Sequence, residues 1–213
     1  MTLDRFRPVA ERILEPFVGI ADRIGLTPDG VSVIAFGFAS LAGVAYALAG
    51  VDAVGPEVGL GAGPALYLVG AVFVLCNGWM DLLDGALARR QGSDSSAGDL
   101  LDHVLDRYAD IVIVAGLAVG TGAHLIGLVA VTGVLMTSYL GTQAQAVGLD
   151  RVYGGVVGRA DRLAIIGIVT AVAAGYGAPV GGRPLAVWLL VFLAVVGHLT
   201  ALQRFYYSMR AID

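Results

Sequence analysis

Four aspartates within residues 81–106 have the spacing of a metal site built on helices. Asp81 and Asp84 are three residues apart, and Asp102 and Asp106 are four residues apart. Residues at these separations lie on one face of a helix, so each pair projects its carboxylates in the same direction. Two such faces opposite each other would form a site for divalent cations.

The apolar surroundings make these carboxylates costly. Residues 65–76 and 111–118 are apolar runs on either side of them, and an ionisable group inside hydrocarbon costs about 2.5–3.5 kcal/mol on insertion scales. Bound cations would offset that cost. Carboxylate oxygens suit magnesium or manganese, whereas the single Cys76 and three scattered histidines cannot build a zinc site. We therefore expect a pair of Mg²⁺ or Mn²⁺ ions as cofactors.

The elements that must position these residues are membrane helices. The 213-residue chain is 57% hydrophobic and 14% charged, with a mean hydropathy of +0.81, which excludes an ordinary soluble domain. A spanning helix needs about 20 residues. We predict an all-α integral membrane protein forming one domain over residues 1–213, without a nucleic-acid partner. Its six transmembrane helices are expected at residues 31–50, 64–89, 98–119, 123–147, 161–178 and 184–207.

The N-terminal residues 1–20 contain too many charges for a cleavable signal peptide. Their apolar residues fall near helical spacing instead, which predicts an amphipathic helix lying on the membrane surface. These residues are Phe6, Val9, Ile13, Leu14 and Phe17. An ordinary solvated terminal helix is the alternative.

The arginines orient the bundle. They gather before the first expected span, after the second, between the fourth and fifth and after the last, whereas the opposite loops hold Asp52, Glu57 and one arginine, Arg183. By the positive-inside rule, both termini and the aspartates face the cytoplasm. We expect a multi-pass protein of a prokaryotic plasma membrane.

The aspartates belong to a longer pattern of eight fixed positions, Asp-x2-Asp-Gly-x2-Ala-Arg-x8-Gly-x3-Asp-x3-Asp. This pattern resembles the defining motif of the CDP-alcohol phosphotransferase family of membrane lipid synthases. The resemblance implies that the hydroxyl of a small alcohol attacks the β-phosphorus of a CDP-lipid and releases CMP. It also implies that Asp81, Asp84 and Asp102 bind metal, while Asp106 takes the proton of the acceptor and touches the second metal.

The nucleotide is expected next to the same motif. Gly85 and Gly98 lack a Cβ and would allow a nucleotide to approach the backbone, and Arg89 offers a fork of donors to a phosphate. Thr27-Pro28-Asp29 resembles a nucleotide-proximal Thr-Pro-Asn segment of the family and equally fits a helix start. The expected CDP-binding residues are Asp29, Asp81, Gly85, Ala88, Arg89 and Gly98.

The acceptor is expected between the fourth and last spans. Gly158-Arg159-Ala160-Asp161-Arg162 and the pair Ser138-Tyr139 resemble segments of the inositol phosphate branch, whose products are phosphatidyl- or archaetidylinositol phosphate. Gly141 and Gln143 stand where that branch has basic residues, so glycerol phosphate remains open as the acceptor. The expected acceptor-binding residues are Ser138, Arg159, Arg162 and Arg204.

Several alternatives and neighbours remain. The aspartates could instead mark the pathway of a divalent cation transporter, or a solvated helix face. Among nearby residues, we expect a structural role for His103, an ion pair for Asp110 with Arg107 or an arginine of another helix, and a brace for Asp81 from Asn77. The family resemblance further implies a homodimer in contact with membrane lipids.

Overall fold

The computed structural model describes residues 7–50, 63–93, 95–149 and 155–212. Those residues form seven α-helices and no β-strand, which confirms the all-α class. The helices are α1 (Arg7–Arg23), α2 (Pro28–Ala49), α3 (Gly63–Gln91), α4 (Ser96–Thr121), α5 (His124–Ala146), α6 (Arg159–Gly175) and α7 (Leu185–Ile212).

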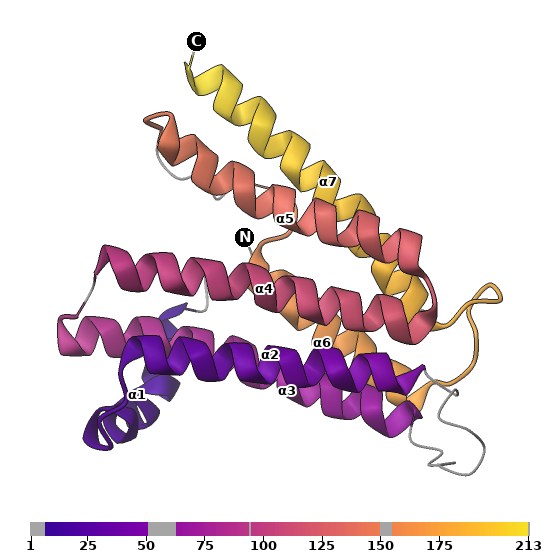
Figure 1. The fold of residues 1–213 in the computed structure, drawn as a ribbon, viewed down its shortest axis with the longest axis horizontal. Helices are drawn as coiled ribbons and strands as arrows, with labels where there is room; N and C mark the ends of the chain where they lie inside the picture. Colours follow the sequence, from indigo (N-terminus) through magenta and orange to yellow (C-terminus); the bar gives the residue numbers. More distant parts are fainter. Residues whose placement is uncertain (1–6, 51–62, 94, 150–154, 213) are drawn as a thin grey trace.

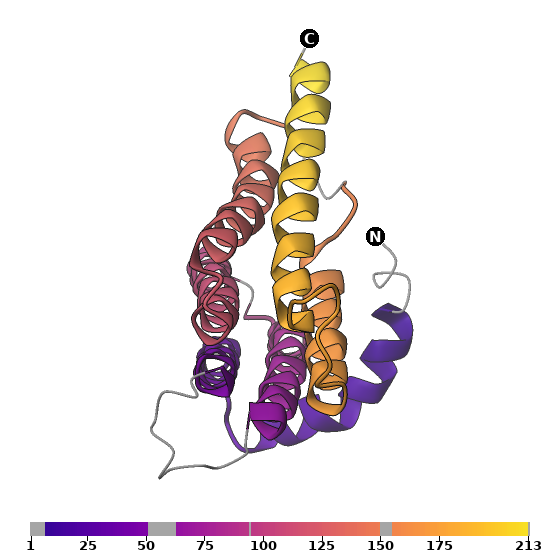
Figure 2. The ribbon, with the colours of Figure 1, turned by 90° about the vertical axis from the view of Figure 1, so that its right-hand side faces the viewer.

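The long helices form two groups that meet along α4. Helix α2 packs against both α3 and α4, and α6 packs against α3 on the other side. Helices α5 and α7 pair with each other and rise away from this group toward the C-terminus (Figure 1). In the perpendicular view, α1 runs obliquely to the long helices (Figure 2), and it packs against α3. The molecule is therefore a helical bundle with one oblique N-terminal helix.

The apolar residues divide between a buried core and an outward surface. Tyr46, Ile113, Leu117 and Leu190 are fully buried between the helices. Many other large apolar side chains point outward, including Leu125, which is 75% exposed. An apolar exterior of this kind suits a hydrocarbon environment.

Within the part of the chain that the structure describes, four helices are long and apolar enough to cross a membrane, namely α2, α3, α5 and α7. The sequence placed two further spans at residues 98–119 and 161–178, where α4 and α6 lie. Helix α4 carries the charged motif, and α6 has only 17 residues. These two spans stay a prediction.

The helix ends follow from capping residues. Thr27 caps α2, because its hydroxyl accepts a hydrogen bond from the Gly30 amide and Pro28 occupies the first helical position. Ser95 caps α4 in the same way through the Gly98 amide. Gly122 ends α4 in the left-handed conformation. The described boundaries of the six long helices consequently lie within a few residues of the predicted ones.

Glycines let α2 and α4 touch backbone to backbone. A Cβ at Gly116 would lie 2.1 Å from the Gly43 carbonyl oxygen, and one at Gly120 would lie 2.1 Å from the Tyr46 carbonyl oxygen. Small residues at such contacts are typical of membrane helix pairs. This contact fixes the height of α4, and thus of its aspartates, relative to α2.

The structure has a helix, α1, over most of the segment predicted at residues 1–20, and the apolar residues of that helix have two environments. Leu14 and Val18 are buried against the bundle, while Ile13 and Phe17 are about half exposed. The apolar residues therefore divide between a protein contact and an outward side. Residues 1–6, including Phe6, and the side chain of Val9 lie outside the described residues.

A polar contact fastens the end of α1 to the end of α3. The Asp22 carboxylate accepts hydrogen bonds from Gln91, at 3.1 Å, and from Arg90, at 3.2 Å. The bond from Gln91, with Arg90 beside it, lowers the pKa of Asp22. Asp22 therefore stays charged at neutral pH and holds α1 beside the bundle.

Candidate active site

The turn after α3 brings aspartates of two helices together. Gly92, with φ of 58°, and the capping Ser95 reverse the chain between α3 and α4. One carboxylate oxygen from each of Asp81, Asp102 and Asp106 then lies within 4.8 Å of the others. The three side chains are half-buried. Helical spacing and the turn together account for this cluster, which we call the carboxylate triad.

The carboxylate triad fits a divalent cation. Oxygens bound to one Mg²⁺ ion at 2.0–2.1 Å lie roughly 3–4 Å apart, so small side-chain rotations would complete the geometry. All three donors are hard oxygens, which magnesium and manganese prefer to softer ligands. The donor set thus agrees with the cofactor that the sequence predicts.

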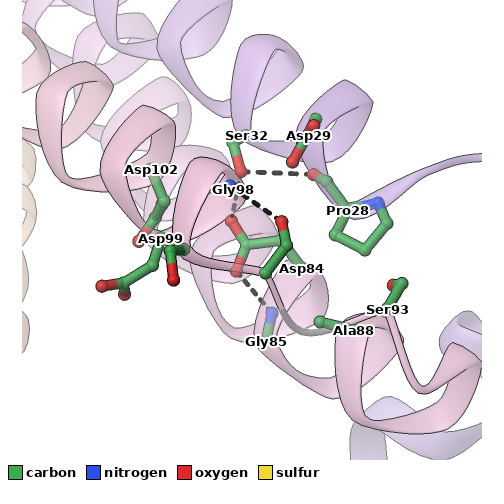
Figure 3. Close-up of a pocket in the computed structure, with 12 residues that line it drawn as sticks. Pro28, Asp29, Ser32, Asp84, Gly85, Ala88, Ser93, Gly98, Asp99 and Asp102 are labelled. Carbon is green, nitrogen blue, oxygen red and sulfur yellow. Dashed lines mark hydrogen bonds between the residues drawn. The ribbon is translucent and has the colours of Figure 1, made fainter.

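Asp84, the fourth predicted metal ligand, lies outside the carboxylate triad. Its carboxylate accepts hydrogen bonds from the Ser32 hydroxyl of α2, at 2.9 Å, and from the Gly85 amide, at 2.5 Å. The residue is 7% exposed and faces a cavity that Asp102 also lines (Figure 3). Asp102 is therefore the residue common to the triad and the cavity.

This cavity has a volume of about 460 Å³ and lies among the ends of α2, α3 and α4. Its lining combines carboxylates, hydroxyls and glycines, a mixture able to hold a polar ligand of some size. The lining residues are Pro28, Asp29, Ser32, Asp84, Gly85, Ala88, Ser93, Ser95, Ser96, Gly98, Asp99 and Asp102. Four of the six predicted CDP-binding residues are among them.

The other two predicted CDP-binding residues lie close by. Asp81 belongs to the carboxylate triad, and the Arg89 guanidinium lies near Gly85, where a Cβ would be 3.5 Å from Arg89 Nη1. A Cβ at Gly98 would be 3.0 Å from Asp29 Oδ1. The missing Cβ of Gly98 thus makes room for the Asp29 side chain of α2 as well as for a ligand.

Arg159 lies against the carboxylate triad. Its guanidinium contacts Asp81 at 2.6 Å and Asp106 at 2.7 Å, and its side chain is 15% exposed. The sequence predicted Arg159 as an acceptor residue but did not predict these ion pairs. No local pattern connects residues 81, 106 and 159, because the pairing depends on how α6 packs against α3.

The remaining predicted acceptor residues lie in separate environments. Arg162 forms a buried ion pair with Asp110 at 2.5 Å, so its guanidinium anchors α6 to α4. Arg204 donates to the Thr137 carbonyl oxygen at 2.7 Å, next to the half-buried Ser138. The single arginine cluster expected from the sequence is therefore divided among three contacts. Arg151, at the same predicted surface, lies outside the described residues.

The structure also decides two neighbouring expectations. Asp110 has the predicted arginine partner from another helix, Arg162. The brace expected for Asp81 is wrong, because the Asn77 amide donates to the Ala35 carbonyl oxygen of α2. His103 lies 3.7 Å from the Asp102 carboxylate. Sequence reasoning missed Ser32, whose only signal was a hydroxyl in an apolar span three residues after Asp29.

The chain is similar to known membrane lipid synthases. The family model for CDP-alcohol phosphatidyltransferase matches residues 26–200. The archaetidylinositol phosphate synthase of Methanothermobacter thermautotrophicus is 33% identical over 210 residues, covering 96% of this chain and 93% of that protein. The phosphatidylinositol phosphate synthase of Mycolicibacterium smegmatis is 34% identical over 209 residues, covering 91% and 82%.

Solved structures give the same picture. The phosphatidylinositol phosphate synthase of Mycobacterium tuberculosis with bound CDP-DAG has a TM-score of 0.75 and 26% identity, over 92% of this chain and 94% of that one. Its complex with manganese and citrate has the same TM-score at 25% identity, over 92% and 88%. Similarity to a transferase family over most of the chain excludes the alternative that the aspartates belong to a divalent cation transporter. The chain belongs to the CDP-alcohol phosphatidyltransferase family.

Proposed function

We propose that this enzyme transfers the phosphatidyl or archaetidyl group of a CDP-lipid to inositol phosphate and releases CMP. The observation that carries the proposal is the carboxylate triad beside a polar cavity of about 460 Å³. The synthases at 33% and 34% identity, named for inositol phosphate products, support this choice of acceptor.

The cavity is the proposed site of the CDP group. CDP-DAG bound to the Mycobacterium tuberculosis enzyme supports this assignment. Asp29 and Ser32 of α2 and the serines of the α3–α4 turn offer hydrogen-bonding groups to the nucleotide. The Arg89 guanidinium, which lies near Gly85, is the proposed donor to a phosphate oxygen. Gly85, Ala88 and Gly98 have little or no side chain, so they leave space for the nucleotide on their side of the cavity.

The proposed metal ligands are Asp81, Asp102 and Asp106 for one ion, and Asp84 with Asp81 and Asp102 for a second. The manganese complex of the Mycobacterium tuberculosis enzyme supports a divalent metal. When bound, Mg²⁺ or Mn²⁺ would neutralise the pyrophosphate charge that grows as its bond breaks. The Ser32 and Gly85 hydrogen bonds hold the Asp84 carboxylate in one orientation for this role.

Asp106 is the proposed general base. The acceptor hydroxyl gives its proton to the Asp106 carboxylate as its oxygen bonds to the β-phosphorus. The bond from that phosphorus to the bridging oxygen breaks, and CMP leaves with the electron pair. Asp106 lies one helical turn beyond Asp102, on the side of α4 that faces Arg159 of α6. A base at this position can reach an acceptor held between α4 and α6.

The acceptor is proposed to bind between α4, α6 and the α5–α7 pair. Arg159 and Arg204 are the candidate hydrogen-bond donors to the phosphate of the acceptor, and Ser138 lies beside Arg204. Arg162 holds α6 against α4 through its buried ion pair with Asp110. Gly141 and Gln143 are uncharged, whereas the inositol phosphate branch has basic residues at these positions. Glycerol phosphate is the alternative acceptor for this reason.

We further propose that helices α2 to α7 all cross the membrane, with both termini and the aspartates on the cytoplasmic side. The arginine distribution supports this orientation. The membrane would be that of a bacterium or archaeon, as it is for the similar synthases. A homodimer is expected from the family resemblance.

The decisive test is CMP release by the purified protein in detergent. Reactions would contain CDP-diacylglycerol or CDP-archaeol, with Mg²⁺ or Mn²⁺, and a panel of inositol phosphate, glycerol phosphate, free inositol and serine. We expect release that depends on both the metal and inositol phosphate. Release with glycerol phosphate alone would replace the acceptor, and release without any metal would overturn the metal assignment.

A further inference from the structure

Arg159 and a metal ion would need the same carboxylates. We propose that Arg159 is an exchangeable cation that holds Asp81 and Asp106 until metal binds, so that metal binding releases it toward the phosphate of the acceptor. Metal and acceptor would then strengthen each other's binding. This inference rests on the proposed metal site and goes beyond it, because it assigns Arg159 a positioning role between two ligands.

The contacts of Arg159 carry the proposal. Its guanidinium bridges an α3 carboxylate and an α4 carboxylate, at 2.6 Å to Asp81 Oδ2 and 2.7 Å to Asp106 Oδ1. Both residues belong to the carboxylate triad, whose oxygens lie within 4.8 Å of one another. Three carboxylates so close repel one another unless a cation lies among them. The guanidinium supplies that cation from the protein itself.

The carboxylates of the site cannot neutralise the arginines and two divalent ions at the same time. Asp81, Asp106 and Asp110 pair with three arginines, at residues 107, 159 and 162. Asp84 and Asp102 lie close enough to interact with these carboxylates. Five carboxylates and three arginines leave two formal negative charges, which one divalent ion neutralises. A second ion makes the cluster positive, which favours the departure of a guanidinium or the arrival of an anionic substrate.

The two arginines of the first turn of α6 differ in how firmly they are held. Arg162 and Asp110 are almost completely buried, with side chains 4% and 2% exposed. Arg159 is 15% exposed, although its guanidinium nitrogens are buried, and its partners Asp81 and Asp106 are 30% and 14% exposed. Arg162 therefore fixes α6 to α4, while the long side chain of Arg159 can change partners without moving the helix.

Exchange of partners makes the coupling reciprocal. A phosphate that takes Arg159 removes a competing cation from Asp81 and Asp106, so it raises their affinity for metal. By linkage, metal raises the affinity for the phosphate by the same factor. Binding of either ligand would thereby favour binding of the other.

Metal affinity measured directly tests this inference. Mn²⁺ binding to metal-stripped protein would be followed by electron paramagnetic resonance, and thermal unfolding would be recorded in EDTA and in Mn²⁺. We expect Arg159→Gln to bind Mn²⁺ about tenfold more tightly than the wild type. Its midpoint of unfolding should fall in EDTA, because the triad loses its cation, and should recover in Mn²⁺.

Arg107→Gln is the matched control. It removes one positive charge 3.8 Å from Asp106 without touching Asp81. We expect less than about a threefold change in Mn²⁺ affinity, as for an unbridged neighbouring charge. Equal gains in both variants would reduce the effect to general electrostatics and overturn the inference. Weaker Mn²⁺ binding by Arg159→Gln would also overturn it, since Arg159 would then be orienting the ligands.

Acceptor binding supplies the second arm. Inositol phosphate binding to the wild type, measured by calorimetry, should be stronger in Mn²⁺ than in EDTA, and Arg159→Gln should lose this difference. A difference that persists in the variant would contradict the exchange. If metal-dependent CMP release holds while these results fail, only this inference falls. If the wild type binds no Mn²⁺ and turns over without metal, the proposed metal site falls with it.

Discussion

Asp106 combines two tasks that are usually separated in an active site. Its carboxylate contacts Arg159 at 2.7 Å and belongs to the carboxylate triad, yet it is also the group assigned to take the acceptor proton. Arg159 holds this carboxylate on the side of α4 that faces α6, beside the proposed acceptor site. The acceptor hydroxyl must lose its own proton readily, which a nearby divalent ion promotes when bound.

Replacing Asp106 by Asn removes the basic group while keeping its size. We expect kcat to fall by about 10²- to 10⁴-fold, the usual contribution of a positioned base. CDP-lipid binding, measured separately by equilibrium titration, should change little because the cavity around Asp84 is intact. Turnover at the wild-type rate would contradict the base assignment.

Arg89 and Arg90 are adjacent, but only the Arg89 guanidinium lies near Gly85, a residue that lines the cavity. Arg89→Ala should raise the KM for CDP-lipid about tenfold, since a charge-assisted hydrogen bond to phosphate is lost. Arg90→Ala is the control, because Arg90 pairs with Asp22 of α1 at 3.2 Å. Steady-state kinetics with varied CDP-lipid would separate them. Equal KM changes in both variants would show that Arg89 acts through general charge.

At the scale of the helices, the turn between α3 and α4 was predictable and the partner of its aspartates was not. The positions of Asp81 and Asp106 on their helices follow from spacing, and Ser95 is an evident cap. Arg159 is 53 residues beyond Asp106 in the chain and meets it only through the packing of α6. A side chain that links three helices leaves no periodic signal in the sequence.

Helix α1 shows a second limit of the same kind. Apolar residues near helical spacing, with charges between them, predicted an amphipathic helix, and the structure has one at Arg7–Arg23. The pattern could not distinguish a face that meets lipid from one that meets protein. Leu14 and Val18 contact the bundle because Leu83 and Leu87 of α3 lie opposite them.

The contact between α2 and α4 should be sensitive to a single added carbon. Gly116→Ala places a Cβ 2.1 Å from the Gly43 carbonyl oxygen, so the helices must separate. We expect a loss of about 1–3 kcal/mol, typical of overpacking, seen as a lower unfolding midpoint in detergent. Mn²⁺ affinity should also fall, because Asp102 and Asp106 move with α4.

Gly37→Ala is the matched control for this contact. Gly37 lies in α2, and nothing lies within 4 Å of the place of its Cβ. Its metal affinity should equal that of the wild type, and its unfolding midpoint should be equal or slightly higher, because alanine favours a helix over glycine by up to about 1 kcal/mol. If Gly116→Ala behaves like Gly37→Ala, the close contact between α2 and α4 does not determine the geometry of the aspartates.

For the whole molecule, the arginine distribution predicts which side faces the cytoplasm, and α7 offers a direct test. Ala178 precedes this helix and Ala211 lies near its end, and both are exposed. Because Cys76 is the only cysteine, single cysteines can be placed at either position in a Cys76→Ser background. A membrane-impermeant maleimide would then report the side on which each lies.

In intact cells we expect labelling of Ala178→Cys and protection of Ala211→Cys, with both labelled after lysis. The positive-inside rule requires this result, because the arginines of the first and last segments and the phosphate-binding residues would then share the cytoplasmic side. Reversed labelling would place the aspartates away from the compartment that holds nucleotide-linked substrates. Labelling of both positions in intact cells would mean that α7 does not cross the membrane. Either result would contradict the proposed orientation, whereas the expected one links the fold to the source of its CDP-lipid.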